Sequence, residues 1–352
     1  MYPRVTINEK KLYENVKTVV EMAEVKGINT LAVTKVFCGM PELAQVCLNA
    51  GVKGLAESRV ENLVRLKDMH AEKTLLRLPM LSEIEKVVRY ADVSLNSEYE
   101  TIKALNKIAS VTGRQHQIVL MIDLGDLREG VLPEDVDAMV EKILKLHAVK
   151  LKGIGVNLTC YGGVIPTPEN LGELVAIAKH LETKFGIDLD VISGGNSSSL
   201  YLLEKGEMPE GINQLRIGEA FVLGRETAYG NAIQGTHDDV FVLEAQIIEL
   251  KEKDSMPKGT IGMDAFGNKP VFQDKGRMQR AIVAIGRQDV DPDGLTPFDL
   301  ALEIIGASSD HMILDVTQSD TPYKVGDVLK FKMDYSAMLK LFTSAYVKKH
   351  IE

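Results

Sequence analysis

The sequence contains no tryptophan, few cysteines and fewer basic than acidic residues. Its 352 residues include 41 lysines and arginines against 50 aspartates and glutamates, which gives a formal net charge of −9. This charge argues against a protein that mainly binds nucleic-acid phosphates or an anionic membrane. The three cysteines, Cys38, Cys47 and Cys160, are an odd number without metal-type spacing, so we expect neither disulfides nor a structural zinc site.

Long apolar runs are also absent. No run approaches the ~20 residues that a membrane helix needs, and the first residues, MYPRVTINEKK, lack the apolar segment of a signal peptide. We therefore expect a cytoplasmic protein in a reducing compartment, without a nucleic-acid or membrane partner. Apolar residues make up 45% of the chain and charged residues 26%, which is ordinary for a globular protein. The length suggests two domains, or a large one and a smaller one.

Short apolar segments alternate with amphipathic, helix-like stretches over roughly the first two thirds of the chain. Most of these segments are continuously apolar, as expected of parallel strands that are buried on both faces. A series of eight strand–helix units predicts an α/β fold, namely a closed (β/α)8 barrel of the TIM type. A doubly wound open sheet is the alternative, but no G-x-G-x-x-G follows the first strand. The eight strand candidates are 29–35, 54–58, 74–79, 92–97, 117–125, 151–158, 191–196 and 214–220.

The pattern changes after about Gly230. Strand-like segments are then separated by turn-rich stretches, which predicts a second, mostly β domain at the C-terminal end. We place the barrel at residues 9–230 and the β domain at 231–352, together with an N-terminal strand at 1–8. The five strand candidates of this domain are 240–250, 280–285, 301–305, 312–316 and 328–333.

Unusual polar residues stand where the predicted barrel strands end, which is the functional end of such barrels. Lys35 closes the first apolar strand, and it is either an amine poised for a Schiff base or a lysine that snorkels to solvent. The segment Ser193–Ser199 (SGGNSSS) follows the seventh strand, where glycines and hydroxyls can hold a phosphate. Arg216 lies within an apolar run and needs a partner. Arg128 stands among acids after the fifth strand, and either binds a carboxylate or belongs to a surface salt-bridge cluster.

Taken together, these features resemble the alanine/ornithine racemase family of fold-type III pyridoxal phosphate enzymes. The resemblance covers essentially the whole chain, and it is closest to the ornithine-specific branch. Six short motifs in order carry it: MIDLGDLREG, GIGVNLTCYG, SGGNSSS, LGRETAYG, DAFGNKP and LEIIGASSD. The resemblance implies an alanine racemase-like barrel followed by a β domain, pyridoxal 5'-phosphate as cofactor, and a homodimer.

The resemblance also implies a role for individual residues. Lys35 would hold the cofactor as a Schiff base and act as one of two acid/base groups, and Arg128 would lie near the substrate carboxylate. Arg216 would face the pyridine nitrogen, where an arginine keeps that nitrogen unprotonated and so favours a racemase over a decarboxylase. The other implied cofactor contacts are Asn157, Thr159, Asn196, Ser197, Ser198, Gly218, Glu219 and Tyr335.

The second acid/base group departs from the family pattern. Arg287 stands where alanine racemases place a tyrosine, so the resemblance does not identify this group. Asp310 and His311 are the leading candidates, and histidine has the better unperturbed pKa for proton transfer near neutrality. Tyr161 and Asp264 remain alternatives. Met121 replaces a lysine that is often modified in alanine racemases.

The resemblance predicts an isomerase that interconverts L- and D-ornithine, with lysine or alanine as further candidates. A side-chain ammonium would need an acid in the pocket, and Asp126, Glu129, Asp289 or Asp310 could supply it. An alanine racemase and a non-catalytic pyridoxal phosphate-binding homeostasis protein are the alternatives. The latter proteins lack a second domain, whereas the sequence predicts one here. A decarboxylase is disfavoured by Arg216, and a metal-dependent aldolase by the lack of a convincing ligand set.

Overall fold

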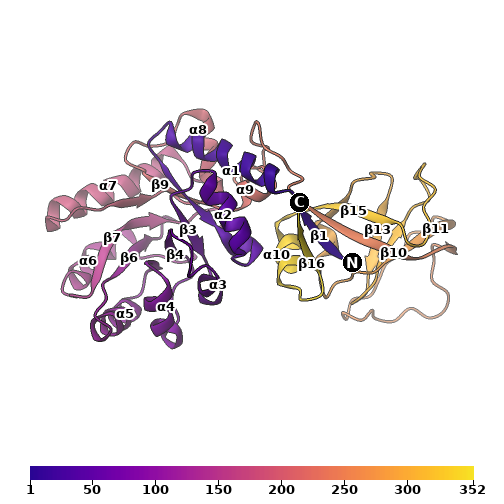
Figure 1. Cartoon of the computed structure of the whole chain (residues 1–352), viewed down its shortest axis with the longest axis horizontal. Coiled ribbons are helices and arrows are strands. Elements are labelled where there is room, and N and C mark those ends of the chain that lie inside the picture. The colour runs from indigo at the N-terminus through magenta and orange to yellow at the C-terminus, as the bar shows by residue number, and fades with distance from the viewer. The chain divides into compact units, whose positions relative to one another are not determined.

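The computed structural model describes residues 1–352 and divides them into two compact units (Figure 1). The first unit consists of Lys10–His237. The second combines Met1–Glu9 with Asp238–Glu352. No helix in the structure is both long enough and apolar enough to cross a membrane.

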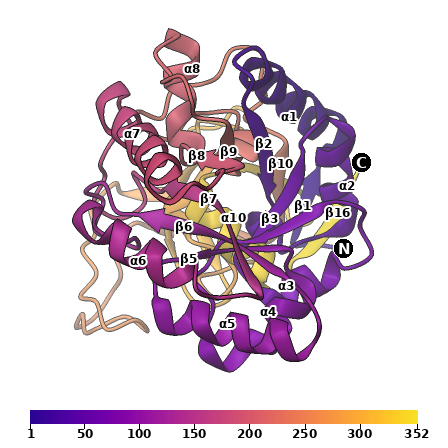
Figure 2. The same ribbon diagram turned by 90° about the vertical axis from the view of Figure 1, so that its left-hand side faces the viewer.

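The first unit is a closed barrel whose eight parallel strands follow one another in sequence order. Figure 2 shows the strands as a ring and the helices around its outside. The predicted barrel and its eight strands are therefore confirmed. The strands are β2 (Asn29–Val33), β3 (Gly54–Glu57), β4 (Glu72–Leu75), β5 (Val93–Asn96), β6 (His116–Ile122), β7 (Val149–Val156), β8 (Val191–Ser193) and β9 (Gln214–Ile217).

Helices alternate with these strands, as a barrel requires. Short 3-10 turns precede several of them at the ends of strands, and these turns become important at the functional end. The helices are α1 (Glu9–Glu24), α2 (Pro41–Asn49), α3 (Val60–Arg65), α4 (Ile84–Tyr90), α5 (Tyr99–Val111), α6 (Val136–Ile143), α7 (Pro168–Phe185), α8 (Leu200–Lys205) and α9 (Glu219–Leu223). The 3-10 turns are η1 (Thr34–Phe37), η2 (Leu81–Glu83), η3 (Pro133–Asp135) and η4 (Ser197–Ser199).

Strand β6 shows why the barrel strands are continuously apolar. Val119 and Met121 belong to a buried core cluster with residues of β5 and β8. Ile118 and Leu120 alternate with them along the strand and are also 0% exposed. Because successive side chains of a strand point to opposite faces, the barrel interior and the helical layer are both filled from one strand.

Helix α7 begins and ends at residues that commonly cap helices. Thr167 caps its N-terminus in a reciprocal capping box with Asn170, and Pro168 occupies the first helical position. Gly186 ends the helix in the left-handed conformation with φ 63°, which glycine adopts without a steric penalty. The prediction that Gly186 ends this helix is confirmed.

The second unit is built on a mostly antiparallel sheet with the strand order β12-β15-β10-β11-β14-β13. Strand β1 also pairs with β10, and β16 pairs with β1. Strand β15 has the bounds that its alternating pattern predicts. The sequence pattern missed β12, β16 and α10, because β12 is short and contains Pro297 and β16 is a polar edge strand. The elements are β1 (Arg4–Ile7), β10 (Phe241–Asp254), β11 (Arg277–Val283), η5 (Pro292–Gly294), β12 (Leu295–Pro297), β13 (Glu303–Ala307), β14 (Met312–Asp315), β15 (Val328–Met333), α10 (Tyr335–Thr343) and β16 (Lys348–Ile351).

Several predicted barrel strands extended too far at their C-terminal ends. Lys35 lies in the 3-10 turn η1 and not in β2, and Asn196 lies beyond β8. Gly218 likewise follows β9. The reason is that loop residues at this end of the barrel are also buried, so burial continues after the ladder of hydrogen bonds has stopped.

Candidate active site

The C-terminal ends of the barrel strands gather the polar residues that the sequence singles out. Parallel strands of a closed barrel all end on the same side, so residues distant in sequence meet there. Five strands and the turns that follow them contribute to this barrel mouth. They supply Lys35 after β2, Arg128 after β6, Asn157 and Thr159 after β7, Asn196, Ser197 and Ser198 after β8, Arg216 within β9, and Gly218 and Glu219 after it.

The turn that carries Lys35 is fixed by a buried carboxyl. Lys35 is half-buried, and the preceding Thr34 is completely buried. The Thr34 hydroxyl donates to Oε2 of Glu57 at 2.9 Å, while Oε1 of Glu57 accepts from the backbone nitrogen of Ser58 at 2.6 Å. Burial raises the pKa of the Glu57 carboxyl, which has no basic partner in this network. Glu57 thus connects the Lys35 turn to the start of α3.

The loop after β8 has the features of an anion-binding loop. Asn196 caps it by accepting from the backbone nitrogen of Ser198 at 2.8 Å. The Ser197 hydroxyl accepts from the backbone nitrogen of Ala220 at 3.2 Å, which leaves its own proton available. The Ser198 hydroxyl is 0% exposed and has no hydrogen-bond partner. A buried, unpaired hydroxyl is unfavourable by itself, so this loop fits a phosphate group that would accept from Ser198.

Arg216 is buried inside the barrel and bonded only to neutral groups. Its Nη2 donates to the carbonyl oxygen of Val156 at 2.8 Å, and its Nη1 donates to the Ser193 hydroxyl. Burial lowers the pKa of Arg216 to about 10, and the Glu129 carboxylate opposes this shift. The guanidinium is therefore a desolvated cation at neutral pH. Its predicted contact to the pyridine ring stays a prediction.

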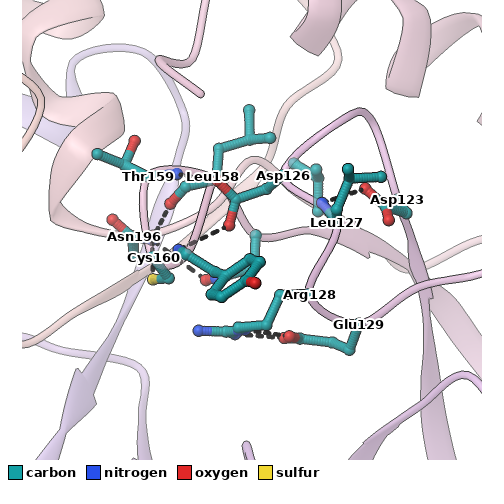
Figure 3. Close-up of polar contacts among 12 residues, drawn as sticks. Asp123, Asp126, Leu127, Arg128, Glu129, Leu158, Thr159, Cys160 and Asn196 are labelled. Carbon is teal, nitrogen blue, oxygen red and sulfur yellow. Dashed lines mark hydrogen bonds and ion pairs between the residues drawn. The ribbon is translucent and has the colours of Figure 1, made fainter. Parts of the chain in front are cut away.

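Arg128 lies in a network of polar groups at the barrel mouth (Figure 3). Its Nε and Nη2 donate to the two carboxylate oxygens of Glu129. Its Nη2 and Nη1 also lie 2.8 and 3.1 Å from one end of the Asn157 amide, so an oxygen there accepts from the guanidinium. The Cys160 thiol is a further partner of Arg128, and it lies 3.5 Å from Nδ2 of Asn196.

Asp126 organises the loop after β7 and does not face the barrel mouth as a free acid. Its side chain is 1% exposed, and Oδ1 accepts from the backbone nitrogens of Thr159 at 3.1 Å and Val164 at 3.3 Å. Oδ2 accepts from the backbone nitrogen of Tyr161 at 3.1 Å (Figure 3). These bonds hold Thr159 in a left-handed conformation with φ 69°.

The other predicted residues belong to the second unit. Tyr335 is half-buried at the start of α10, where Asp334 caps the helix. Asp310 and His311 are both exposed in the tight turn between β13 and β14. The backbone nitrogen of Arg287 donates to the carbonyl of Ser308 at 2.8 Å, so this segment lies beside the turn. The roles of Tyr335, Asp310 and His311 stay predictions.

Two residues of the site network were not recognised from the sequence. Glu57 was missed, although an acid directly after the continuously apolar Gly54–Ala56 is a signal of a buried carboxyl. Glu129 was considered as a partner for a substrate amine, but not as the partner of its neighbour Arg128. No spacing rule predicts a bidentate pair between adjacent loop residues, because it depends on the loop conformation.

Comparisons with known proteins identify the family of the chain. A family model described as "Alanine racemase, N-terminal domain" matches residues 7–226. The chain is 52% identical to an ornithine racemase of Acetoanaerobium sticklandii over 352 residues, which covers 100% of both chains. It is 46% identical to a lysine racemase of Thermotoga maritima over 354 residues, covering 100% of this chain and 99% of the relative.

Solved structures show the same fold at low sequence identity. An alanine racemase of Clostridium difficile superposes with a TM-score of 0.75 and 17% identity, covering 100% of this chain and 96% of that one. The family model spans more than half of the chain, and two relatives match it from end to end. The chain therefore belongs to the alanine racemase family.

Proposed function

We propose that the protein is a pyridoxal phosphate-dependent amino-acid racemase that interconverts L- and D-ornithine. The full-length ornithine racemase relative supports ornithine as the substrate, and the lysine racemase relative supports lysine as a second one. Ornithine and lysine both carry an ammonium group on the side chain, and alanine does not. Alanine is therefore the less favoured alternative. The observation that carries the proposal is one barrel mouth that combines Lys35, the buried Arg216 and the unpaired Ser198 hydroxyl.

Each of these residues has a separate task in the proposed reaction. Pyridoxal phosphate, when bound, supplies an electron-accepting ring that stabilises the carbanion left by removal of the α-proton. Lys35 would anchor it through Nζ and would take or return the proton on one face of the substrate. Ser197 and Ser198 would hold the phosphate, and Asn157 and Thr159 would flank the ring.

Arg216 would control the charge of the pyridine ring. A guanidinium releases its proton only with difficulty, so Arg216 would donate a hydrogen bond to the ring nitrogen without protonating it. The neutral partners of Arg216 leave this donor role open. A carboxylic acid in the same place would protonate the nitrogen, which favours the side reactions of related decarboxylases.

The second proton-transfer group and the assembly are part of the proposal. The Asp310 and His311 side chains are exposed and adjacent. Either side chain could therefore reach a substrate that is bound outside the second unit. We assign the second base to this turn and propose a homodimer in which Tyr335 contributes to the phosphate site. None of the three cysteines forms a disulfide bond, as expected for the reducing, cytoplasmic location that we propose.

The decisive experiment is α-proton exchange with chiral product analysis. Purified protein with pyridoxal phosphate is incubated with L-ornithine in D2O. The enantiomers are then separated, and the deuterium content of each is measured by mass spectrometry. Deuterated D-ornithine is expected. The Lys35→Ala variant should lose the exchange, whereas Lys26→Ala, which removes an exposed lysine of the barrel, should retain it.

Two results would contradict the proposal. Full racemisation by Lys35→Ala would remove Lys35 from the chemistry. Absence of exchange with ornithine, lysine and alanine, in protein that still holds pyridoxal phosphate tightly, would support the non-catalytic carrier. The second unit argues against that carrier, because Met1–Glu9 and Asp238–Glu352 form a sheet domain that a carrier of one domain does not need.

A further inference from the structure

The pair formed by Arg128 and Glu129 is more than a surface salt bridge. Two nitrogens of the guanidinium, Nε and Nη2, donate to the two oxygens of the carboxylate (Figure 3). The Glu129 side chain is only 13% exposed and the Arg128 side chain 42%. Bidentate geometry and partial burial distinguish this pair from exposed ion pairs, which contribute little because water screens them.

The loop that carries the pair is fixed by the backbone. The backbone nitrogen of Asp123 donates to the carbonyl of Val131 at 3.0 Å, and Val131 donates to the carbonyl of Met121 at 2.8 Å. Gly130 has φ 144°, and a Cβ on it would lie 2.3 Å from the backbone nitrogen of Asp123. Backbone hydrogen bonds therefore join the two ends of the loop, and they fix the position of Glu129 within it.

The two edges of the Arg128 guanidinium have different surroundings. The edge formed by Nε and Nη2 is occupied by Glu129. The edge formed by Nη1 and Nη2 lies beside the Asn157 amide, next to the loop residues that follow β7 and β8. The N–H groups of this second edge donate to the Asn157 amide oxygen. A carboxylate ligand that approaches from the barrel mouth would replace this amide and accept both N–H groups in parallel.

Glu129 also balances the charge of the barrel mouth. Arg128 and Arg216 act on each other as like charges, and the Glu129 carboxylate acts favourably on both. By themselves, the Arg128, Arg216 and Glu129 side chains carry one excess positive charge. Without the Glu129 carboxylate, the two arginines would repel each other in a partly desolvated site.

We propose that Glu129 is a positioning residue for substrate recognition: it holds Arg128 so that the Nη1–Nη2 edge receives the substrate carboxylate. The inference rests on the proposed function for the role of Arg128, and it adds the residue through which that role is set. Glu129 itself does not contact the substrate. Its effect should therefore depend on Arg128 and on the presence of a carboxylate in the ligand.

The first test separates substrate binding from turnover. In Glu129→Gln, the amide retains one acceptor but loses the charge and the bidentate pair, so we expect KM for the amino acid to rise about 10- to 100-fold. The value of kcat should change by less than about threefold, because Lys35 is untouched. Glu134→Gln, which removes an exposed carboxylate just beyond the same loop, is the matched control and should leave both constants unchanged.

The second test measures the binding of probes that cannot be racemised. Isothermal titration of the holoenzyme with 5-aminovalerate and with 1,4-diaminobutane compares two ornithine-like probes, of which only the first has a carboxylate. Glu129→Gln should weaken binding of 5-aminovalerate about tenfold or more and leave 1,4-diaminobutane unchanged. If both probes weaken equally, or neither does, the positioning role is wrong. Thermal unfolding of each variant shows whether a loss reflects misfolding.

A third comparison tests whether Glu129 acts through Arg128. In an Arg128→Lys background, Glu129→Gln should change KM by less than about twofold, since the bidentate edge is already gone. A full effect in that background would assign Glu129 a direct contact with the substrate and overturn the proposal. If the wild type racemises another amino acid and not ornithine, the proposed substrate fails separately. The same comparison is then made with that amino acid, its analogue without the α-amine and its decarboxylated amine.

Discussion

The Thr34 hydroxyl donates to Oε2 of Glu57 at 2.9 Å, and both side chains are 0% exposed. Thr34 immediately precedes Lys35, and Glu57 immediately precedes the segment that starts α3. The hydrogen bond therefore joins the ends of the neighbouring strands β2 and β3, next in sequence to the proposed catalytic amine of Lys35. A buried carboxyl without a basic partner depends on neutral donors such as this hydroxyl for its hydrogen bonds.

Replacing Thr34 by valine should destabilise the barrel. Valine keeps the size of the side chain but removes the donor, so Oε2 of Glu57 loses a partner in a buried environment. We expect the free energy of unfolding to fall by about 1–3 kcal/mol, measured by denaturant unfolding. Thr34→Ser retains the hydroxyl and should lose much less. A loss in Thr34→Ser with none in Thr34→Val would show that the methyl group, and not the hydrogen bond, stabilises this turn.

His116 predicts a specific loss of stability in acid. It is 2% exposed at the start of β6, its Nε2 lies 2.8 Å from the Ser94 hydroxyl, and burial lowers its pKa to about 4. An unfolded histidine titrates near its ordinary value of about 6.5. The unfolded state therefore binds the proton first as pH falls, so His116 lowers the free energy of unfolding by about 2 kcal/mol between pH 7 and pH 5.

The measurement is the free energy of unfolding at these two pH values. His116→Gln cannot be protonated in this range, so it should lose about 2 kcal/mol less than the wild type on acidification. His70→Gln, at an exposed position, is the control and should behave like the wild type. The same pH dependence in all three proteins would show that other groups cause the acid destabilisation.

Particular residues show what the sequence could predict and what it could not. The barrel follows from eight apolar segments, because burial on both faces produces runs such as Ile118–Ile122 that no exposed element would show. The position of Lys35 at the functional end follows from strand order. The bond between Thr34 and Glu57 and the pair of Arg128 with Glu129 depend on turn geometry, and turn geometry depends on φ angles such as that of Gly130. Residue type alone does not specify it.

Asp126 predicts how the loop after β7 responds to loss of a charge. Its carboxylate accepts from three backbone nitrogens, those of Thr159, Tyr161 and Val164. In Asp126→Asn, one acceptor becomes an amide nitrogen that faces an N–H donor, and we expect a loss of about 1–3 kcal/mol of local stability. Hydrogen exchange should therefore speed up over residues 158–164. Exchange rates unchanged in this segment would show that the loop is held by other contacts.

The Ser198 hydroxyl connects stability with cofactor binding. It is completely buried and has no hydrogen-bond partner, so it costs free energy unless a ligand accepts from it. The neighbouring Ser199 differs, because its hydroxyl donates to the carbonyl of Gly194 at 2.6 Å. Replacing these two adjacent serines by alanine should therefore have opposite effects on the stability of the protein without cofactor.

In the absence of cofactor, Ser198→Ala should leave the free energy of unfolding unchanged or raise it by up to about 1 kcal/mol, since an unsatisfied group is removed. The same variant should bind pyridoxal phosphate about 10- to 100-fold more weakly, because a hydrogen bond to a charged phosphate is lost. Ser199→Ala should lower stability, because it leaves the Gly194 carbonyl without this donor. Calorimetric unfolding and fluorescence titration with pyridoxal phosphate measure both effects. A Ser198→Ala protein that is less stable without cofactor and binds it normally would exclude this hydroxyl from the phosphate site.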